Sequence, residues 1–130
     1  MINVAIRADA SHQIGTGHVM RCLTLAQELR CQFKTVRVIF LCRRAKGCVT
    51  SKILNAGFEC IQLSPGFDNA SSHLKHGSWL RASQKLDAVE FQLALNKYNI
   101  DYLDLVIVDH YGIDHEWHKL VKIFAKKLFV

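Results

Sequence analysis

The sequence lacks the features of a membrane protein and of a secreted protein. Two of its longest apolar stretches, 38–42 and 105–108, fall far short of the roughly 18 to 20 residues that a membrane helix needs. Residues 1–7 lack the basic region, the long apolar run and the cleavage site of a secretion signal. We therefore expect a soluble, cytoplasmic protein without a membrane span.

Proline and paired cysteines are also scarce. Pro65 is the only proline, and the five cysteines include no C-x-x-C pair, which argues against a disulfide framework and against a zinc knuckle. We interpret the cysteines as reduced, mostly buried thiols. No internal repeat or low-complexity segment is present. With 130 residues, 50% of them apolar, the chain has the size and composition of one domain with a buried core.

Acidic residues are scarce in the first half of the chain. Residues 1–60 hold nine Lys or Arg and three acids, whereas residues 61–130 hold eight of each. The basic run 43–46 could contact nucleic acid or a phosphorylated ligand, but a solvated loop at a strand end explains it equally well. Because no recognition helix, zinc-finger spacing or aromatic strip accompanies the charge, we expect no nucleic-acid partner.

Apolar runs of strand length alternate along the chain with amphipathic segments of helix length. We expect strands at 2–7, 36–42, 58–63, 103–108 and 128–130, and helices at 19–30, 51–56, about 79–98 and 114–125. This alternation predicts an α/β, Rossmann-like fold with a parallel sheet of order 3-2-1-4-5. Since the sequence stops inside a predicted strand, we expect the natural polypeptide to continue.

The predicted strand order makes the first and fourth strands neighbours at the point where the winding reverses. Ligands of open α/β sheets bind beyond the carboxyl ends of the strands at this point. The loops that follow these two strands, 8–17 and 109–113, should therefore face one another there. Both loops carry polar residues that could bind a ligand or take part in a reaction.

The first loop contains Gly15 and Gly17 and leads to His18 at the start of a helix. Glycines let the backbone pass close to a ligand, and a helix N-terminus disfavours an imidazolium. His18 could therefore accept a proton, as a general base must, or it could merely cap the helix or pack beneath the loop. A dinucleotide site is less well supported, because Met20 stands where the third glycine of G-x-G-x-x-G belongs.

The second loop places Asp109, His110 and Tyr111 directly after a buried strand. Asp109 could orient a histidine or bind a sugar hydroxyl, and Tyr111 could hydrogen-bond a ligand or a water molecule. An ordinary turn explains the same residues. His115 and His118 could chelate a metal, but we expect them to be exposed, and we predict no metal site. No G-x-S-x-G elbow and no recognisable cysteine nucleophile is present.

Three motifs together resemble the N-terminal half of the UDP-sugar hydrolases of pseudaminic acid biosynthesis. They are Arg7-Ala8-Asp9-Ala10-Ser11, the segment from Ile14-Gly15-Thr16-Gly17-His18 to Leu23, and Asp109-His110-Tyr111-Gly112. Further matches are Trp79-Leu80, Ser83-Gln84 and Asp87-Ala88. The resemblance is spread over essentially the whole chain.

The resemblance implies a GT-B-type enzyme of two Rossmann-like domains, of which residues 1–130 form the N-terminal one. Such enzymes hydrolyse a UDP-linked diacetamido-trideoxy sugar at the anomeric C–O bond with inversion, and they need no metal or other cofactor. Their C-terminal domain, absent from this sequence, holds most of the UDP, so we expect the isolated chain to be inactive. The product of the pathway decorates flagellins and surface polysaccharides.

The resemblance also assigns roles to individual residues. It makes His18 the general base that activates water. The remaining candidates line the sugar site or leave room for it: Asp9, Gly15, Gly17, Asp109, His110 and Tyr111. Two other functions stay open at this point. One is a GT-B-type glycosyltransferase that uses a nucleotide-sugar, and the other is a non-catalytic domain that binds a nucleotide or a partner.

Overall fold

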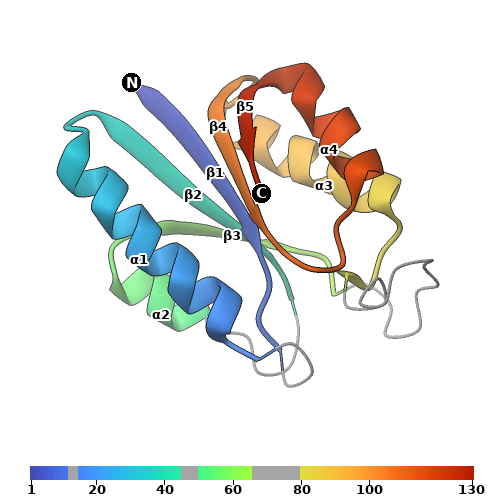
Figure 1. Ribbon diagram of the computed structural model, residues 1–130, viewed down its shortest axis with the longest axis horizontal. Helices are drawn as coiled ribbons and strands as arrows, with labels where there is room; N and C mark the ends of the chain where they lie inside the picture. The colour runs from blue at the N-terminus through green and yellow to red at the C-terminus, as the bar shows by residue number, and fades with distance from the viewer. Residues whose placement is uncertain (12–14, 45–49, 66–79) are drawn as a thin grey trace.

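Five strands form one parallel sheet, with helices on both of its faces (Figure 1). The computed structural model describes residues 1–11, 15–44, 50–65 and 80–130. The strands are β1 (Ile2–Ala8), β2 (Val36–Arg43), β3 (Glu59–Leu63), β4 (Leu103–Asp109) and β5 (Ala125–Phe129). Their order is β3-β2-β1-β4-β5, and each pairing is parallel. The predicted Rossmann-like fold and its strand order are confirmed.

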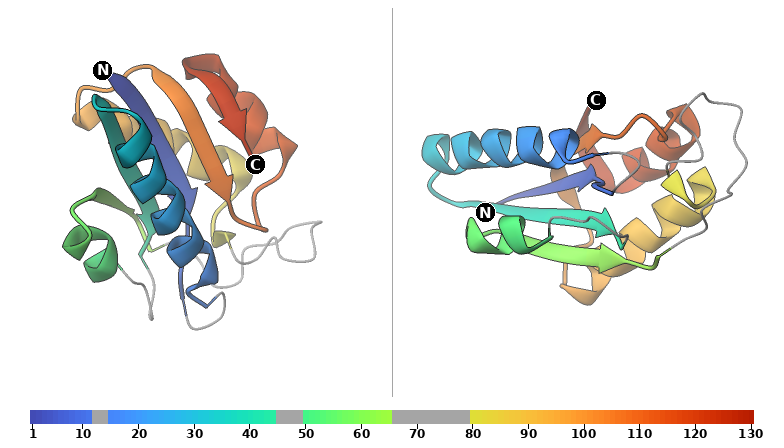
Figure 2. Two further views of the ribbon diagram at one scale, coloured as in Figure 1. Left: turned by 60° about the vertical axis from the view of Figure 1, so that its left-hand side comes forward. Right: turned by 90° about the horizontal axis from the view of Figure 1, so that it is seen from below.

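The sheet divides the apolar core into two layers, and helices cover the layer on each of its faces (Figures 1 and 2). They are α1 (Gly17–Gln32), α2 (Thr50–Asn55), α3 (Gln84–Lys97) and α4 (His115–Val121). Successive strand residues point to opposite faces, so Ile6 packs with Val19 of α1 whereas Ala5 packs with Phe91 of α3. No helix among the described residues is long and apolar enough to cross a membrane.

Helix α3 begins later than the sequence pattern predicts. Its N-cap is Ser83, whose hydroxyl accepts a hydrogen bond from the Leu86 amide at 3.0 Å. Just before it, Arg81 has a φ of 56°, a left-handed conformation that a continuous helix cannot contain. The predicted start near residue 79, which itself lies outside the described residues, is therefore too early, because a cap satisfies the first amides of the helix at Ser83.

The boundary between α4 and β5 also differs from the prediction. Helix α4 ends at Val121, a single 3-10 turn follows, and β5 begins at Ala125 rather than at residue 128. Ala125 pairs with Leu103 of β4. The next two residues, Lys126 and Lys127, are exposed on this edge strand. Lysine is uncommon in strands but discourages an edge from pairing with other chains, which is why the apolar pattern missed this strand's start.

The four described cysteines are free, and two of them are buried, whereas we predict mostly buried thiols from the sequence. Cys22 and Cys42 are buried, Cys60 is half-buried and Cys31 is exposed. Cys48 lies outside the described residues.

Candidate active site

The candidate site lies where β1 and β4 run side by side. Ala8, the last residue of β1, pairs with Asp109, the last residue of β4. On its other edge β1 pairs with β2, so the winding of the sheet reverses between β1 and β4. The two loops predicted to face one another do so, since contacts join His18 to Asp109 and Asp9 to His110.

His18 and Asp109 form a closely held pair. The Nδ1 atom of His18 lies 2.6 Å from Oδ1 of Asp109, and the two side chains are 10% and 17% exposed. A carboxylate can only accept, so Nδ1 carries a proton, and in the neutral ring Nε2 has the lone pair. None of the described residues hydrogen-bonds Nε2 of His18. An imidazole oriented by a carboxylate, with its other nitrogen available, is suited to remove a proton from a ligand or from water.

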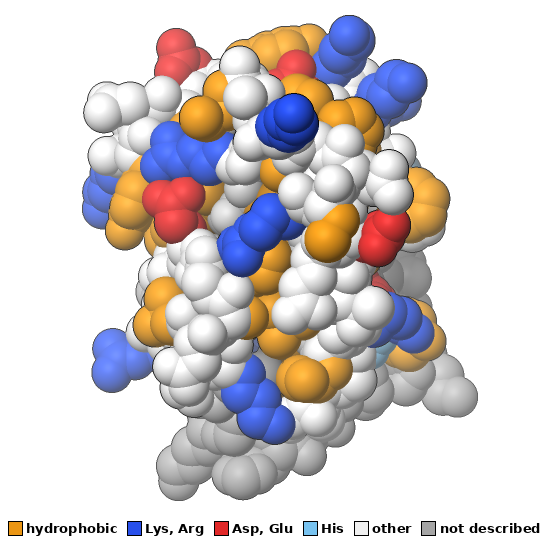
Figure 3. Space-filling model, turned by 90° about the vertical axis from the view of Figure 1, so that its left-hand side faces the viewer, with side chains coloured by type: hydrophobic (Ala, Val, Ile, Leu, Met, Phe, Trp, Pro, Cys, Tyr) orange, Lys and Arg blue, Asp and Glu red, His pale blue; other side chains and the backbone are white. Residues whose placement is uncertain are grey.

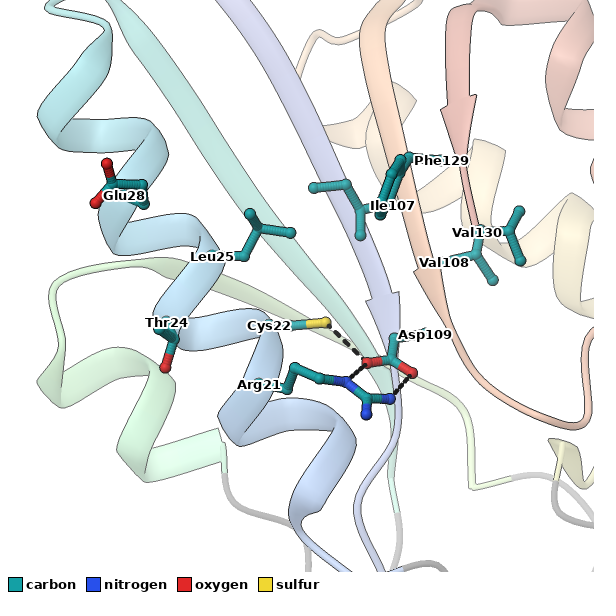
Figure 4. A pocket seen from close by; sticks show the side chains of 10 residues that line it. All are labelled: Arg21, Cys22, Thr24, Leu25, Glu28, Ile107, Val108, Asp109, Phe129 and Val130. Atoms are coloured by element: carbon teal, nitrogen blue, oxygen red, sulfur yellow. Dashed lines mark hydrogen bonds and ion pairs between the residues drawn. The ribbon is translucent and has the colours of Figure 1, made fainter.

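Two further side chains of α1 reach the same carboxylate (Figure 4). Arg21 donates from Nε to Oδ2 of Asp109 at 2.7 Å and from Nη2 to Oδ1 at 2.6 Å. The thiol of Cys22 lies 3.8 Å from Oδ2. Burial disfavours the charge of Asp109, but the hydrogen bonds from Arg21 and His18 outweigh it and lower the pKa of this carboxyl. We call His18, Arg21, Cys22 and Asp109 the Asp109 cluster.

Tyr111 and the two glycines border this cluster. The Tyr111 ring meets the His18 ring edge-on, with centroids 4.8 Å apart, and it is 59% exposed. Gly15 has a φ of 81°, which explains a glycine at that position. A Cβ atom at Gly15 or Gly17 would meet no atom of the described residues within 4 Å, so both positions are open with respect to that part of the chain. Tyr111 and the glycines are thus placed where a ligand of His18 could reach them.

Asp9 and His110 are placed differently from the other candidates. Their side chains are 3% and 2% exposed, and Oδ2 of Asp9 lies 2.9 Å from Nε2 of His110. Asp9 also accepts from Arg7 at 2.6 Å and from the Arg43 amide at 2.7 Å, and Nδ1 of His110 accepts from the Gly112 amide at 2.9 Å. These contacts hold the two loops together beneath the surface, so a supporting role fits both residues better than the predicted contact with a substrate.

Sequence reasoning missed a larger buried ionic network around Asp87 of α3. Its carboxylate accepts from Arg7 at 3.0 and 2.7 Å, from Arg43 at 2.6 Å and from the Trp117 indole at 2.8 Å. Arg7, Arg43, Asp87 and Trp117 are fully buried. Burial opposes the charge of Asp87, but Arg7 and then Arg43 outweigh it and lower its pKa. We call these four residues the Asp87 network. The feature of the sequence that could have indicated it is an arginine at the end of an apolar strand.

The Asp87 network changes the interpretation of the basic first half of the chain. Arg43 was expected in a solvated or ligand-binding run, but it is the last residue of β2 and is buried. Arg7 is buried as well, and Arg21 and Arg37 are paired with acids. On the face seen in Figure 3, Lys and Arg are scattered among apolar and neutral side chains. Net charge therefore overstates how basic this surface is.

A groove extends from the Asp109 cluster along the face of the sheet that carries α1 (Figure 4). Its volume is about 730 Å³, and its apolar walls include Leu25, Ile107 and Phe129. Asp109 and Arg21 belong to the lining too. Arg21 is the only Lys or Arg among the described residues that line the groove. A ligand next to His18 could therefore place an apolar part in the groove.

The histidines of α4 offer no convincing metal site. His115 is exposed, as predicted, whereas His118 is half-buried, and desolvation by burial lowers its pKa. Within the described ranges, no three His, Cys, Asp or Glu side chains gather as ligands for a metal ion.

Comparison with known proteins adds one relative. No protein-family model matches the chain. The chain is 31% identical over 127 residues to MJ1062, an uncharacterized protein of Methanocaldococcus jannaschii. The match covers 98% of this chain but 21% of that protein, so the chain spans about a fifth of the length of the relative it matches.

Proposed function

We propose that this chain is the catalytic-base domain of a GT-B-type nucleotide-sugar hydrolase. The substrate is a UDP-linked diacetamido-trideoxy sugar of pseudaminic acid biosynthesis, and the reaction releases UDP and the free sugar in the cytoplasm. The observation that carries the proposal is the 2.6 Å contact between His18 and Asp109 at the reversal point of the sheet. It gives the family's expected base a carboxylate partner, which the sequence alone had left open.

In the proposed reaction a water molecule attacks the anomeric carbon from the side opposite the UDP. Nε2 of His18 takes a proton from the water as its oxygen bonds to the carbon, and Asp109 stabilises the imidazolium that forms. The bond between the anomeric carbon and the UDP oxygen breaks, its electron pair leaves with the diphosphate, and the anomeric centre inverts. Asp109 thus orients the base, and Tyr111 is the residue placed to contact the sugar.

A second, nucleotide-binding domain completes the proposed enzyme. The sugar then lies between the two domains, with His18 on one side and the diphosphate on the other. The length of the Methanocaldococcus jannaschii relative is compatible with further domains, because the match occupies 21% of that protein. The proposal requires no metal and no other cofactor.

The test is a proton NMR time course of the UDP-sugar with the longest polypeptide of this reading frame, beside residues 1–130. We expect a free sugar whose first-formed anomer is inverted, and no turnover by residues 1–130 alone. His18→Ala should slow release of UDP by about 10²- to 10⁴-fold. His115→Ala is the matched control, since His115 is an exposed histidine on α4. A near-normal rate in folded His18→Ala would overturn the proposal.

The groove beside the cluster favours one alternative, a glycosyltransferase. Hydrolysis needs only a water molecule, whereas about 730 Å³ of groove with apolar walls could hold an acceptor that has an apolar part. Product analysis separates the two reactions, because a transferase yields a sugar conjugate and a hydrolase yields free sugar. Tight binding of UDP to residues 1–130 alone would instead favour a non-catalytic nucleotide-binding domain.

A further inference from the structure

Arg21 and His18 share one carboxylate, and this arrangement has a consequence for the basicity of the histidine. They lie three positions apart on α1 and therefore project from the same side of the helix. Both reach Oδ1 of Asp109 at 2.6 Å, and Nη2 of Arg21 lies 3.4 Å from Nδ1 of His18. A permanent cation thus stands beside the imidazole on the same acceptor.

The charges in this arrangement oppose one another. A carboxylate alone next to a histidine favours the imidazolium, because the two form an ion pair. A guanidinium on the same carboxylate offsets that negative charge and disfavours a second positive charge nearby. The N-terminus of α1, where His18 is the second residue, acts in the same direction.

Few groups compete with this effect. Among the described residues, the charged or titratable side chains that contact His18 are Asp109 from β4, Arg21 from α1 and Tyr111 from the loop after β4. Arg21 is the one cation of the three. Its side chain is 64% exposed, so it can be replaced without opening a cavity in the core.

We propose that Arg21 is a positioning residue that fixes the Asp109 carboxylate with its fork and disfavours a second positive charge on the neighbouring His18 ring. The benefit of this effect for catalysis rests on the proposed function, since only an unprotonated His18 can take a proton from water. The effect itself is measurable without turnover. It is a property of the free chain.

The test is an NMR titration of the His18 ring protons in the 130-residue chain, assigned by their loss in His18→Gln. Arg21→Gln should raise the pH of half-protonation of His18 by about one unit, because the cation that opposes the imidazolium is gone. Arg37→Gln is the matched control. Arg37 forms the same kind of fork on Glu59, at 2.9 and 3.0 Å, but on β2 and β3. An unchanged or lowered midpoint in folded Arg21→Gln would overturn the proposal.

Arg21→Lys separates charge from geometry. Lysine keeps the positive charge but cannot form the fork, so we expect it to shift the midpoint less than Arg21→Gln does. Equal shifts in the two variants would contradict a role for the charge. In an active polypeptide, the acid limb of kcat/KM should move to higher pH in Arg21→Gln by the same amount. If no nucleotide-sugar is turned over while the NMR shift is present, the proposed function fails and the assignment of Arg21 stands.

Discussion

Two aspartates of this protein each bind an arginine through a fork of hydrogen bonds, yet their surroundings differ. Asp87 is fully buried, and Arg7, Arg43 and Trp117 occupy its carboxylate. Asp109 lies near the surface, and its arginine is 64% exposed. The buried network is closed to ligands, whereas the Asp109 cluster includes a histidine nitrogen that no described residue occupies. The same residue types therefore support the fold in one place and suit chemistry in the other.

The largest effect should come from opening the buried network. Asp87→Asn keeps the shape of the side chain but removes the carboxylate that Arg7 and Arg43 share. Of the described carboxylates, only Asp9 and Glu90 then face the two arginines, and the loss costs about 3–5 kcal/mol. The thermal unfolding midpoint, measured by circular dichroism, should fall by roughly 10 °C or more. Asp101→Asn, at an exposed position, should leave it unchanged. Equal midpoints in the two variants would contradict the structural role of Asp87.

The same change at Asp109 should act on rate rather than on stability. Asp109→Asn removes the carboxylate that orients His18, so the proposed turnover should drop by about 10²- to 10⁴-fold. The free energy of unfolding should change by about 1 kcal/mol or less, because an ion pair with an arginine that is 64% exposed contributes little. Steady-state kinetics and urea unfolding of one preparation check both values. A large loss of stability with an unchanged rate would reverse the assignment of the two aspartates.

Acid should destabilise the folded chain through its buried carboxylates. Burial disfavours their charge, but Arg7 outweighs it and holds the pKa values of Asp9 and Asp87 below the ordinary range. The unfolded chain therefore binds protons at a pH where the folded chain does not. Their contribution to stability is present above about pH 4 and is lost as the pH falls further. Urea unfolding between pH 3 and pH 7 should show this loss, with a shallower slope in Asp87→Asn; a flat profile in the unsubstituted protein would count against it.

The smallest effect concerns a thiol of the Asp109 cluster. Burial and then the negative charge of Asp109 raise the pKa of Cys22 to about 12. At pH 8 iodoacetamide should therefore modify Cys22 much more slowly than the exposed Cys31. Asp109→Asn should speed the reaction of Cys22 and leave Cys31 unaffected, as peptide mass spectrometry can measure. Equal reactivity of the two thiols would show that the carboxylate does not act on Cys22.

The sheet could be predicted because its apolar strands have a clear pattern and the crossover rule limits their order. The apolar pattern did not predict where β5 and α3 begin, because edge-strand charge, capping and backbone conformation set these two boundaries. Lys126 and Lys127 interrupt the apolar pattern at the start of β5, although an edge strand tolerates exposed lysines. Arg81 and Ser83 set the start of α3 by backbone conformation and capping, which an apolar periodicity does not report.

The meeting of His18, Asp109 and Tyr111 could be predicted from the placement of their two loops after neighbouring strands. The sequence does not predict which side chains of these loops are buried. His110 stands between Asp109 and the exposed Tyr111 in the sequence but pairs with Asp9 beneath the surface. One partner of Arg7 is Asp87, 80 residues away, and nothing local indicates that pair. These buried contacts depend on how the strands and helices pack against one another, and a short sequence motif does not determine that packing.

The Asp87 network also has a consequence for the time course of folding. Asp87 lies 80 residues after Arg7, 44 after Arg43 and 30 before Trp117. During synthesis, the two arginines lack the Asp87 carboxylate until α3 has left the ribosome and docked on the sheet. The first three strands by themselves therefore lack one counterion of their buried arginines, because Asp9 binds Arg7 but the Asp87 carboxylate is still absent. Closing such distant contacts is slow, so this network forms late and completes the fold.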